Sequence, residues 1–555
     1  MGRDRVNERR VMIIGLDALT PELTWPWVAE GVLPNLARVL ETGAGGPLRS
    51  TIPPCSPAAW STFATGLNPG KHGIIGFSRT RSDDYRPRLA TAADRAGETF
   101  WETAGRHGIS GGILNLPFTY PPKPFNGFMI SGMMTPRLGR AMASPPEVFD
   151  DLMAASPDYT IDVGLLSAVG EAPETILARL LDSLRARCRA AVGLYRKHRP
   201  PLFCVVFVAA DRACHCFWPY LEAARSGQTL TPRQQRIAGA VRTTYAALDE
   251  AVGTLMAEAG ADTDVLLLSD HGSGPLRAGL SLRKALAAAG LLTPTPPRPF
   301  ARGRRSAGRL LARVVPYSLK RVLRSLLPGL AGCVASGAAA GGVDYRRSLA
   351  YPVGADHGVY VNLRGRQPQG IVEPGAEYEG VRNRVIEALR PLRDPRTGRP
   401  VIRAVHRRED IWSGPRLDCL PDLIVESEDD QYSMQTLSEG PDGGAVYALP
   451  EVRWDRVRLM GGHRSEGVLM AAGPHVRHVE LPDAAIADVP ATVLALLGCP
   501  IPEDYDGRVL TEMLTDDVSA PRRAAVPRTE PGPDGALPRR DEAAVRSRLE
   551  QLGYM

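Results

Sequence analysis

The feature that most constrains the fold of this chain is a set of short apolar runs, each about as long as one buried β-strand. The runs occupy residues 11–16, 202–208, 265–268 and 468–471. Stretches with helical character, such as 173–197 and 232–258, lie between them. Strand-like runs that alternate with helices predict an α/β fold with a mainly parallel sheet. Because some runs lie hundreds of residues apart, one sheet would be assembled from distant segments.

Three of these runs lead into an aspartate. Asp17 follows the first run directly, Asp211 follows the second, and Asp270 follows the third. In open α/β sheets, ligands bind beyond the carboxyl ends of the strands, so the three carboxylates are expected to converge. An aspartate after a strand is also common as a turn residue or a helix cap, and each one taken alone allows that interpretation.

Two of these aspartates have a histidine close by in the sequence. Asp211 and His215 have the i, i+4 spacing that puts both side chains on one face of a helix, and His271 directly follows Asp270. Carboxylate oxygen together with imidazole nitrogen suits Zn²⁺ or Mn²⁺. The alternatives are a salt-bridged helix start and an ordinary turn. His463 lies in a glycine-rich turn before the last apolar run, where the alternative is a loop histidine without a ligand.

The segment around Ser56 combines a hydroxyl with a predicted helix start. Ser56 is followed by Pro57, which reads as an N-cap with proline at the first helical position, and the helix is expected to end at Gly66. A hydroxyl at this place lies among unpaired N–H groups and at the positive end of the helix dipole. That environment binds phosphate or sulfate and favours an alkoxide. The simpler interpretation is a serine that only caps the helix.

Taken in chain order, the motifs of this sequence resemble those of the alkaline phosphatase superfamily. The motifs are GLD, SP…TG…PGKHGI, DxxxH, SDHG and GGHRxxGxxxxxGP, within about residues 11–475. Within the superfamily, the resemblance is to the type I phosphodiesterase/nucleotide pyrophosphatase family and its bacterial cytoplasmic phosphohydrolase/phosphomutase-like group. It implies a three-layer α/β/α core with a central, mainly parallel sheet and a helical cap insertion.

For the site, the resemblance implies two divalent metal ions, usually zinc, with manganese as the alternative. The ligands that it implies are Asp211, His215 and His463 for one metal, and Asp17, Asp270, His271 and the hydroxyl of Ser56 for the other. The nucleophile of the superfamily stands nine positions before the threonine of a Thr-Gly pair, and here that position is Ser56. Its alkoxide would attack phosphorus and form a phosphoseryl intermediate, which water then resolves.

The function that the resemblance implies is a metal-dependent phosphohydrolase of the phosphodiesterase or nucleotide pyrophosphatase type, acting on a phosphorylated small molecule or a nucleotide. The alternatives are a phosphotransferase, phosphomutase or phosphomonoesterase on the same site, or a membrane-surface binding protein with a vestigial site. At two positions this sequence departs from the usual pattern of the family, which leaves its specificity for diesters open. The family usually has a threonine nucleophile, and an asparagine where this chain has Phe77. Arg79 and Lys71 are candidates for a replacement charge, and His357 is a candidate to face the site.

We predict that the chain is divided into four parts. The catalytic core would comprise residues 1–293 and 343–515, interrupted by a basic helical insertion or cap at 294–342, with a linker and C-terminal helix at 516–555. Residues 298–324 carry nine Arg/Lys and no acidic residue. We favour a cap helix that packs its apolar side on the core. The alternatives are peripheral contact with an anionic membrane and guidance of a polyanionic substrate.

The composition of the chain argues against several other classes of protein. The formal net charge of +6 is too small to indicate nucleic-acid binding. The eight cysteines are scattered and form no C-x-x-C pair, which argues against a disulfide framework or a zinc ribbon. The N-terminal segment is a poor signal peptide, and we find no uninterrupted apolar stretch of about 18 residues. We therefore expect a cytoplasmic protein; the sequence does not indicate its oligomeric state.

Overall fold

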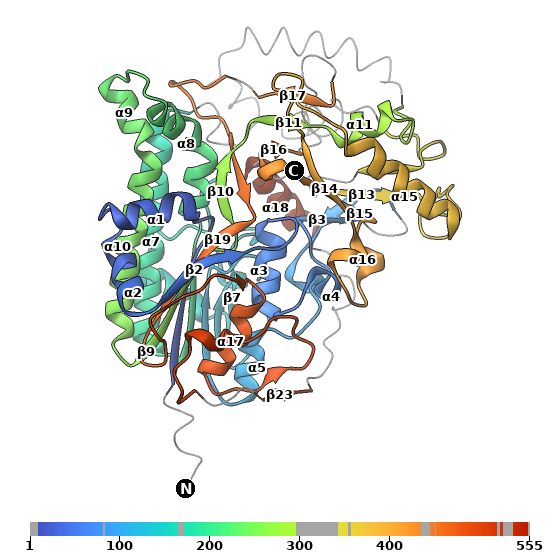
Figure 1. Cartoon of the computed structure of the whole chain (residues 1–555). Coiled ribbons are helices and arrows are strands. Elements are labelled where there is room, and N and C mark those ends of the chain that lie inside the picture. The colour runs from blue at the N-terminus through green and yellow to red at the C-terminus, as the bar shows by residue number, and fades with distance from the viewer. Residues whose placement is uncertain are drawn as a thin grey trace.

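In the computed structural model, one ten-stranded sheet forms the centre of the molecule (Figure 1). Its strand order is β20-β2-β19-β9-β1-β8-β5-β6-β7, and β21 also pairs with β2. The strands are β1 (Arg10–Leu16), β2 (Ala44–Arg49), β5 (Gly111–Leu114), β6 (Gly127–Ile130), β7 (Ala143–Ser144), β8 (Leu202–Phe207), β9 (Thr263–Leu268), β19 (Glu466–Ala472), β20 (Val479–Glu480) and β21 (Ala484–Ala485). From β9 to β6 all neighbouring strands are parallel. The expected α/β class with a mainly parallel sheet is thus confirmed.

The structure describes most of the chain. The described ranges are 9–80, 84–164, 171–295, 342–352, 357–434, 444–449, 451–518, 522–525 and 537–552. The predicted basic insertion, including the arginine-rich stretch at 298–324, therefore lies almost entirely outside the described residues. Among the helices that are described, none is both long enough and apolar enough to cross a membrane.

All four apolar runs form strands of the central sheet, but one of them runs in the unexpected direction. The run at 468–471 lies in β19, which pairs antiparallel with both β9 and β2. The expectation of a parallel strand was wrong here because the chain enters β19 from β18 (Gly461–Arg464), which pairs with β10 (Gly272–Pro275) just beyond the carboxyl end of β9. β19 therefore starts at the edge where the parallel strands end.

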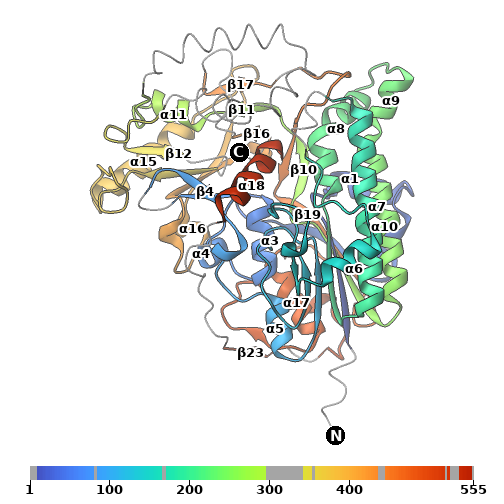
Figure 2. The same cartoon turned by 180° about the vertical axis from the view of Figure 1, so that it is seen from behind.

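Helices cover both faces of the sheet (Figures 1 and 2). Alternate residues of β1 point to opposite faces: Met12 and Ile14 belong to one buried cluster, Val11 and Ile13 to the other. The first cluster includes side chains of α1 (Pro21–Ala29), α2 (Pro34–Thr42), α7 (Pro173–His198), α8 (Ala209–Arg225) and α10 (Ala240–Ala259). The second includes side chains of α3 (Ser56–Thr65), α5 (Phe100–Arg106) and α17 (Asp488–Leu496). This is the three-layer α/β/α arrangement that was expected.

The helical stretch predicted at 232–258 is divided in two. α9 (Pro232–Ala238) ends at Gly239, and α10 begins at the next residue. Thr231 caps α9 in a capping box with Gln234, which fixes where this short helix begins. The stretch predicted at 173–197 forms the single helix α7, as expected.

A smaller, antiparallel sheet packs beside the main one (Figure 1). Its order is β12-β13-β15-β14. The elements are β12 (Ala350–Pro352), β13 (Gly358–Val361), β14 (Ile402–Arg407) and β15 (Leu423–Ser427), with α11 (Leu282–Ala288) and α15 (Ala376–Leu389) beside them. It has its own buried cluster, which includes Leu286, Val359, Val385 and Val425. All four strands of this sheet follow the predicted insertion, and α11, which precedes the insertion, packs in the same buried cluster.

Candidate metal centre

The carboxyl ends of three adjacent strands bring three aspartates to one place. Asp17 follows β1, Asp211 lies in the first turn of α8 just after β8, and Asp270 follows β9. β8, β1 and β9 are neighbours and run parallel, so they end at the same edge. All three aspartates are fully buried. Burying three carboxylates together is costly unless positive charge accompanies them, so the cluster indicates a site for cations.

The first cluster consists of Asp211, His215 and His463. The Nε2 atoms of His215 and His463 are 3.2 Å apart. Oδ1 of Asp211 lies 3.2 Å from Nε2 of His215 and 3.4 Å from Nε2 of His463. His215 follows Asp211 by one turn of α8, as its spacing predicts, whereas His463 arrives from β18 (Gly461–Arg464), 248 residues further along the chain.

The second cluster consists of Asp17, Asp270, His271 and Ser56. Nε2 of His271 is at its centre, 3.2 Å from Oγ of Ser56, 3.3 Å from Oδ2 of Asp270 and 3.8 Å from Oδ1 of Asp17. The two clusters adjoin, because the rings of His271 and His463 stack with their centroids 3.9 Å apart. The structure thus brings together all seven side chains that the sequence singled out.

The three histidines all present the same nitrogen to the clusters. In each of them Nδ1 bonds a backbone carbonyl oxygen, which can only accept, so Nδ1 carries the proton. The carbonyls belong to Gly461 for His215 (2.7 Å), Pro54 for His463 (3.0 Å) and Gly272 for His271 (3.0 Å). Each Nε2 in the neutral ring therefore directs a lone pair at its cluster. Metal-binding histidines are oriented in this way in proteins.

The carboxylates of the second cluster show a shortage of positive charge. Burial and the carboxylates of Asp270 and Asp211 raise the pKa of Asp17 well above its usual range. Burial, with Asp211, raises the pKa of Asp270 to about 8. Burial lowers the pKa of His271 to about 4 and that of His463 to about 3. The rings stay neutral while the carboxylates crowd together, and divalent cations would relieve both effects.

The donor atoms also have the separations that a metal needs. Ligands at about 2.0–2.1 Å around a tetrahedral ion lie roughly 3.3 Å from one another. In the first cluster the three separations are 3.2, 3.2 and 3.4 Å. In the second, Oδ1 of Asp17 and Oδ2 of Asp270 are buried and have no hydrogen-bond partner among the described residues. Both clusters therefore fit divalent cations.

Ser56 stands one position further into its helix than expected. α3 begins at Ser56, the N-cap is Cys55, and no side chain caps the helix. The carbonyl of Cys55 accepts the first helical bond, from the N–H of Ala59 at 3.0 Å. The interpretation of Ser56 as a capping serine is thus wrong. Its hydroxyl, which is not used for capping, points to His271. The helix ends at Gly66, with φ at 67°, as expected.

A short ribbon places His463. β18 pairs antiparallel with β10 (Gly272–Pro275), and His463 lies opposite Ser273. Gly461 makes this approach possible, because a Cβ there would lie 2.1 Å from the carbonyl oxygen of Cys214 in α8. The guanidinium of Arg464 donates to the carbonyl oxygens of Asp430 (2.7 Å) and His463 (2.7 Å), which ties the ribbon down. The glycine-rich turn around His463 was the sequence signal for this close approach.

Arg212 and Asp162 belong to the site, and sequence reasoning missed both. The side chains of Arg212 and Asp162 are each 1% exposed. Arg212 donates to Oδ2 of Asp162 at 2.7 Å, and its Nη1 pairs with Oδ2 of Asp211. Asp162 has no motif to mark it, and Arg212 reads from sequence as a solvated residue between two ligands. The pair fixes the side of Asp211 that faces away from the histidines.

We expect replacement of Arg212 by methionine to lower the free energy of unfolding by about 3–5 kcal/mol, because it leaves two buried carboxylates without their guanidinium. Urea denaturation of the metal-depleted protein measures this. Arg189→Met is the matched control, since Arg189 pairs with Asp158 at an exposed site, 2.6 Å apart. The control should change stability by less than about 1 kcal/mol. Equal effects of the two changes would contradict the role given to Arg212.

The remaining positions that the sequence singled out near the site lie in different surroundings. Phe77 is buried in the main core, with its ring centroid 6.1 Å from that of Phe118, so it presents no polar group to the site. Lys71 is paired with Asp506 at 2.5 Å. Burial, with a smaller contribution from His463, lowers the pKa of His357 to about 4, and its facing the site stays a prediction. Arg79 lines a separate cavity, described below.

The order of the motifs resembles that of the alkaline phosphatase superfamily, whose members in this branch cleave phosphoric ester or phosphoanhydride bonds. The family model described as type I phosphodiesterase / nucleotide pyrophosphatase matches residues 11–456. This chain belongs to that family, which confirms the resemblance found in the sequence, and the protein is a hydrolase of such bonds. Comparison with curated protein sequences gave no significant match.

Solved structures with a similar fold include two enzymes. One is murine ectonucleotide pyrophosphatase/phosphodiesterase 5, an inactive variant in complex with AMP. It is 12% identical, with 92% of this chain and 100% of that chain covered, at a TM-score of 0.49. The other is phosphonoacetate hydrolase from Sinorhizobium meliloti 1021 in complex with phosphonoformate. It is 14% identical, with 89% of this chain and 96% of that chain covered, also at 0.49.

Proposed function

We propose that this protein hydrolyses phosphate diesters or phosphoanhydrides through a phosphoseryl intermediate on Ser56, at a centre that holds two divalent metal ions. The observation that carries the proposal is the position of the Ser56 hydroxyl. It lies 3.2 Å from Nε2 of His271, inside one cluster of metal-ligating side chains and beside the other. Asp211, His215 and His463 would hold one ion. Asp17, Asp270, His271 and Ser56 would hold the second.

The start of α3 prepares Ser56 for attack on phosphorus. Pro57 has no N–H, and the N–H groups of Ser56 and Ala58 make no backbone hydrogen bond to any residue in the described part of the chain. These groups and the helix dipole favour negative charge on the serine oxygen and on a phosphoryl group beside it. Divalent ions at this centre supply a lowered pKa for the hydroxyl and positive charge for the phosphoryl oxygens.

The reaction has two displacements. In the first, a bond forms between Oγ of Ser56 and phosphorus while the bond from phosphorus to the leaving oxygen breaks, and the leaving oxygen takes up a proton. In the second, water oxygen attacks phosphorus, the Oγ–phosphorus bond breaks, and Ser56 regains its proton. The rings of His215, His271 and His463 stay oriented by their carbonyl partners throughout.

A panel of substrates tests this proposal. The full-length protein, loaded with Zn²⁺ or with Mn²⁺, is assayed with bis-p-nitrophenyl phosphate, p-nitrophenyl phosphate and a p-nitrophenyl nucleotide ester. We expect at least about tenfold higher kcat/KM for a diester than for the monoester. A second assay adds glycerol as an alcohol acceptor and measures how much phosphoryl group is transferred to it instead of to water. Faster turnover of the monoester, or transfer that exceeds hydrolysis, would favour the phosphatase or phosphotransferase alternative. No turnover with either metal would overturn the proposal.

A further inference from the structure

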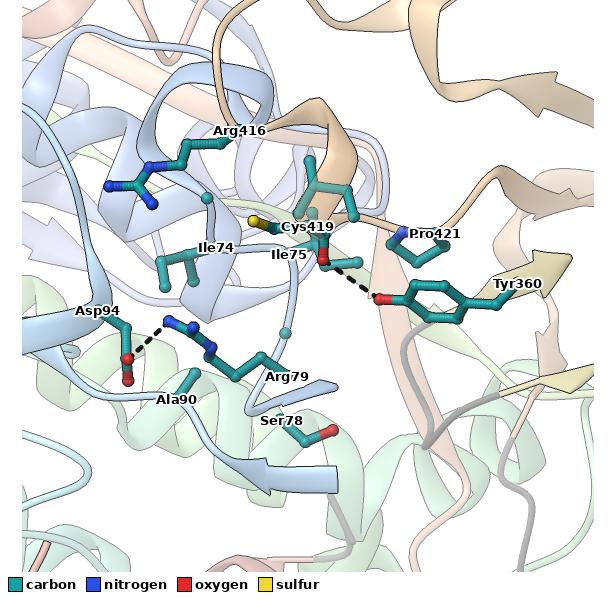
Figure 3. A pocket seen from close by; sticks show the side chains of 13 residues that line it. Ile74, Ile75, Ser78, Arg79, Ala90, Asp94, Tyr360, Arg416, Cys419 and Pro421 are labelled. Atoms are coloured by element: carbon teal, nitrogen blue, oxygen red, sulfur yellow. Dashed lines mark hydrogen bonds and ion pairs between the residues drawn. The ribbon is translucent and has the colours of Figure 1, made fainter. Parts of the chain in front are cut away.

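A small cavity lies between the loop that follows α4 (Pro69–His72) and the segment that precedes β15 (Figure 3). Gly73, Ile75 and Arg79 line one side, and Tyr360 and Arg416 come from the smaller-sheet region. Its volume is about 30 Å³. In the same measure one water molecule takes roughly 10–15 Å³, so the cavity has room for a carboxylate-sized group and none for a nucleobase.

The walls of this cavity carry excess positive charge. Oδ1 of Asp94 accepts from Arg79 at 2.7 Å and from Arg88 at 3.0 Å. Its Oδ2 accepts from the N–H of Thr91 at 2.9 Å, so both oxygens are in use. Arg79, Asp94 and Arg416 line the cavity, whereas Arg88 pairs with Asp94 from outside it. Two guanidinium groups against one carboxylate leave one positive charge in excess on the wall.

Arg416 is held in place, and its charge has no partner among the residues that the structure describes. Its N–H donates to the carbonyl oxygen of Gly70 at 2.8 Å. Its aliphatic stem lies over Gly73, where a Cβ would be 3.6 Å from Cγ of the arginine. In the part of the chain that the structure describes, no hydrogen bond or ion pair reaches its guanidinium group. Figure 3 shows this group on the same side of the cavity as that of Arg79.

The proximity of the two arginines has an electrostatic signature. Burial, together with the positive charges of Arg88 and Arg416, lowers the pKa of Arg79 below its usual value, against the attraction of Asp94. An anion in the cavity would relieve this repulsion. Guanidinium groups bind carboxylate and phosphate with paired, directional hydrogen bonds, so an oxyanion is the ligand that this wall fits.

The cavity adjoins the proposed nucleophile. The carbonyl of Ile75, on the cavity wall, accepts a hydrogen bond from Sγ of Cys55 at 3.0 Å. Cys55 directly precedes Ser56, so the Ile75 carbonyl on this wall lies within roughly 12 Å of the Ser56 hydroxyl, given the 3.8 Å spacing of neighbouring Cα atoms and the lengths of the two side chains. A group attached to the substrate a few bonds from phosphorus can span that distance.

We propose that this cavity binds an oxyanion, a carboxylate or a phosphate, carried by the leaving group of the substrate, with Arg416 and Arg79 as the residues that recognise it. The inference rests on the proposed function. It assigns to this enzyme a substrate class in which the phosphate ester and a second anionic group belong to one small molecule.

Matched substrates test the inference. Three methyl aryl phosphodiesters are compared, whose leaving phenols carry a para-carboxymethyl, a para-phosphonomethyl or a neutral para-carboxamidomethyl group. We expect the wild-type protein to prefer the anionic leaving groups over the amide by about tenfold in kcat/KM. Arg416→Gln should bring this ratio close to one. Arg390→Gln, at an exposed position after α15, should keep it. The ratio between the two anionic substrates tells whether a carboxylate or a phosphate is preferred.

A ratio near one in the wild type, or a ratio that Arg416→Gln leaves intact, would overturn the inference. A second measurement tests the anion site independently of the proposed hydrolysis. It is calorimetric binding of 4-hydroxyphenylacetate, which has no phosphate. Binding to the wild type that Arg416→Gln weakens at least fivefold supports the cavity even if none of the diesters is hydrolysed. Equal binding to both proteins contradicts an anion site in the cavity even if all the diesters are hydrolysed.

Discussion

Replacing Ser56 by alanine is expected to lower kcat on a phosphodiester by about 10⁴-fold or more, while the protein stays folded. The alanine removes the oxygen that would form the bond to phosphorus. Among the described residues it removes one side-chain hydrogen bond, the 3.2 Å bond to His271, and it leaves the other side chains of both clusters in place. Steady-state assays with bis-p-nitrophenyl phosphate, together with metal analysis of both proteins, measure the effect.

Ser61→Ala is the matched control for this change. Ser61 lies on the same helix, is fully buried, and its Oγ has no hydrogen-bond partner among the residues described. We expect its kcat to stay within about twofold of the wild type. If Ser56→Ala kept the wild-type rate, the phosphoseryl mechanism would be wrong, and a water molecule would have to be the direct nucleophile.

Removing the metals is expected to have the second large effect. Chelation should abolish turnover, and Zn²⁺ or Mn²⁺ should restore it. It should also lower stability, because the ions bind only the folded chain. At a free metal concentration 1,000 times Kd, each site contributes about 4 kcal/mol to the free energy of unfolding. Mass spectrometry of the native protein should find two ions per chain. Unchanged activity after complete removal would contradict the proposed centre.

Variants of single ligands sharpen this test. His463→Ala removes one of three donors that lie within 3.4 Å of one another, and it should reduce the bound metal to about one ion per chain. His107→Ala, at an exposed position after α5, is the control and should keep two ions. If both variants kept the wild-type metal content, His463 would not be a ligand.

Much of the fold could be predicted, because the relevant signals are local. A buried strand needs a short apolar run, and β1, β8, β9 and β19 all come from such runs. The end of a strand is equally local, so Asp17 and Asp270 could be placed at the sheet edge. The spacing of Asp211 and His215 is fixed by one turn of a helix. Each of these features depends on a few neighbouring residues.

Features that depend on distant segments could not be predicted in the same way. The direction of β19 depends on the ribbon of β10 and β18, and this direction brings His463 to the edge where the parallel strands end. The partnership of Arg212 with Asp162 joins residues 50 positions apart and has no periodic signal. Whether Cys55 or Ser56 occupies the N-cap position of α3 depends on backbone angles that the residue types leave open.

By itself, the sequence determined the α/β class, the membership of the phosphodiesterase family, and the identity of seven side chains suited to two metals and a nucleophile. Only the tertiary structure decided that their donor atoms lie 3.2–3.8 Å apart, which nitrogen each histidine presents, and that Arg416 and Arg79 share one cavity. The physical reason is that residue type sets which chemistry a side chain can perform. Distances between segments are set by the packing of the whole sheet and its helices.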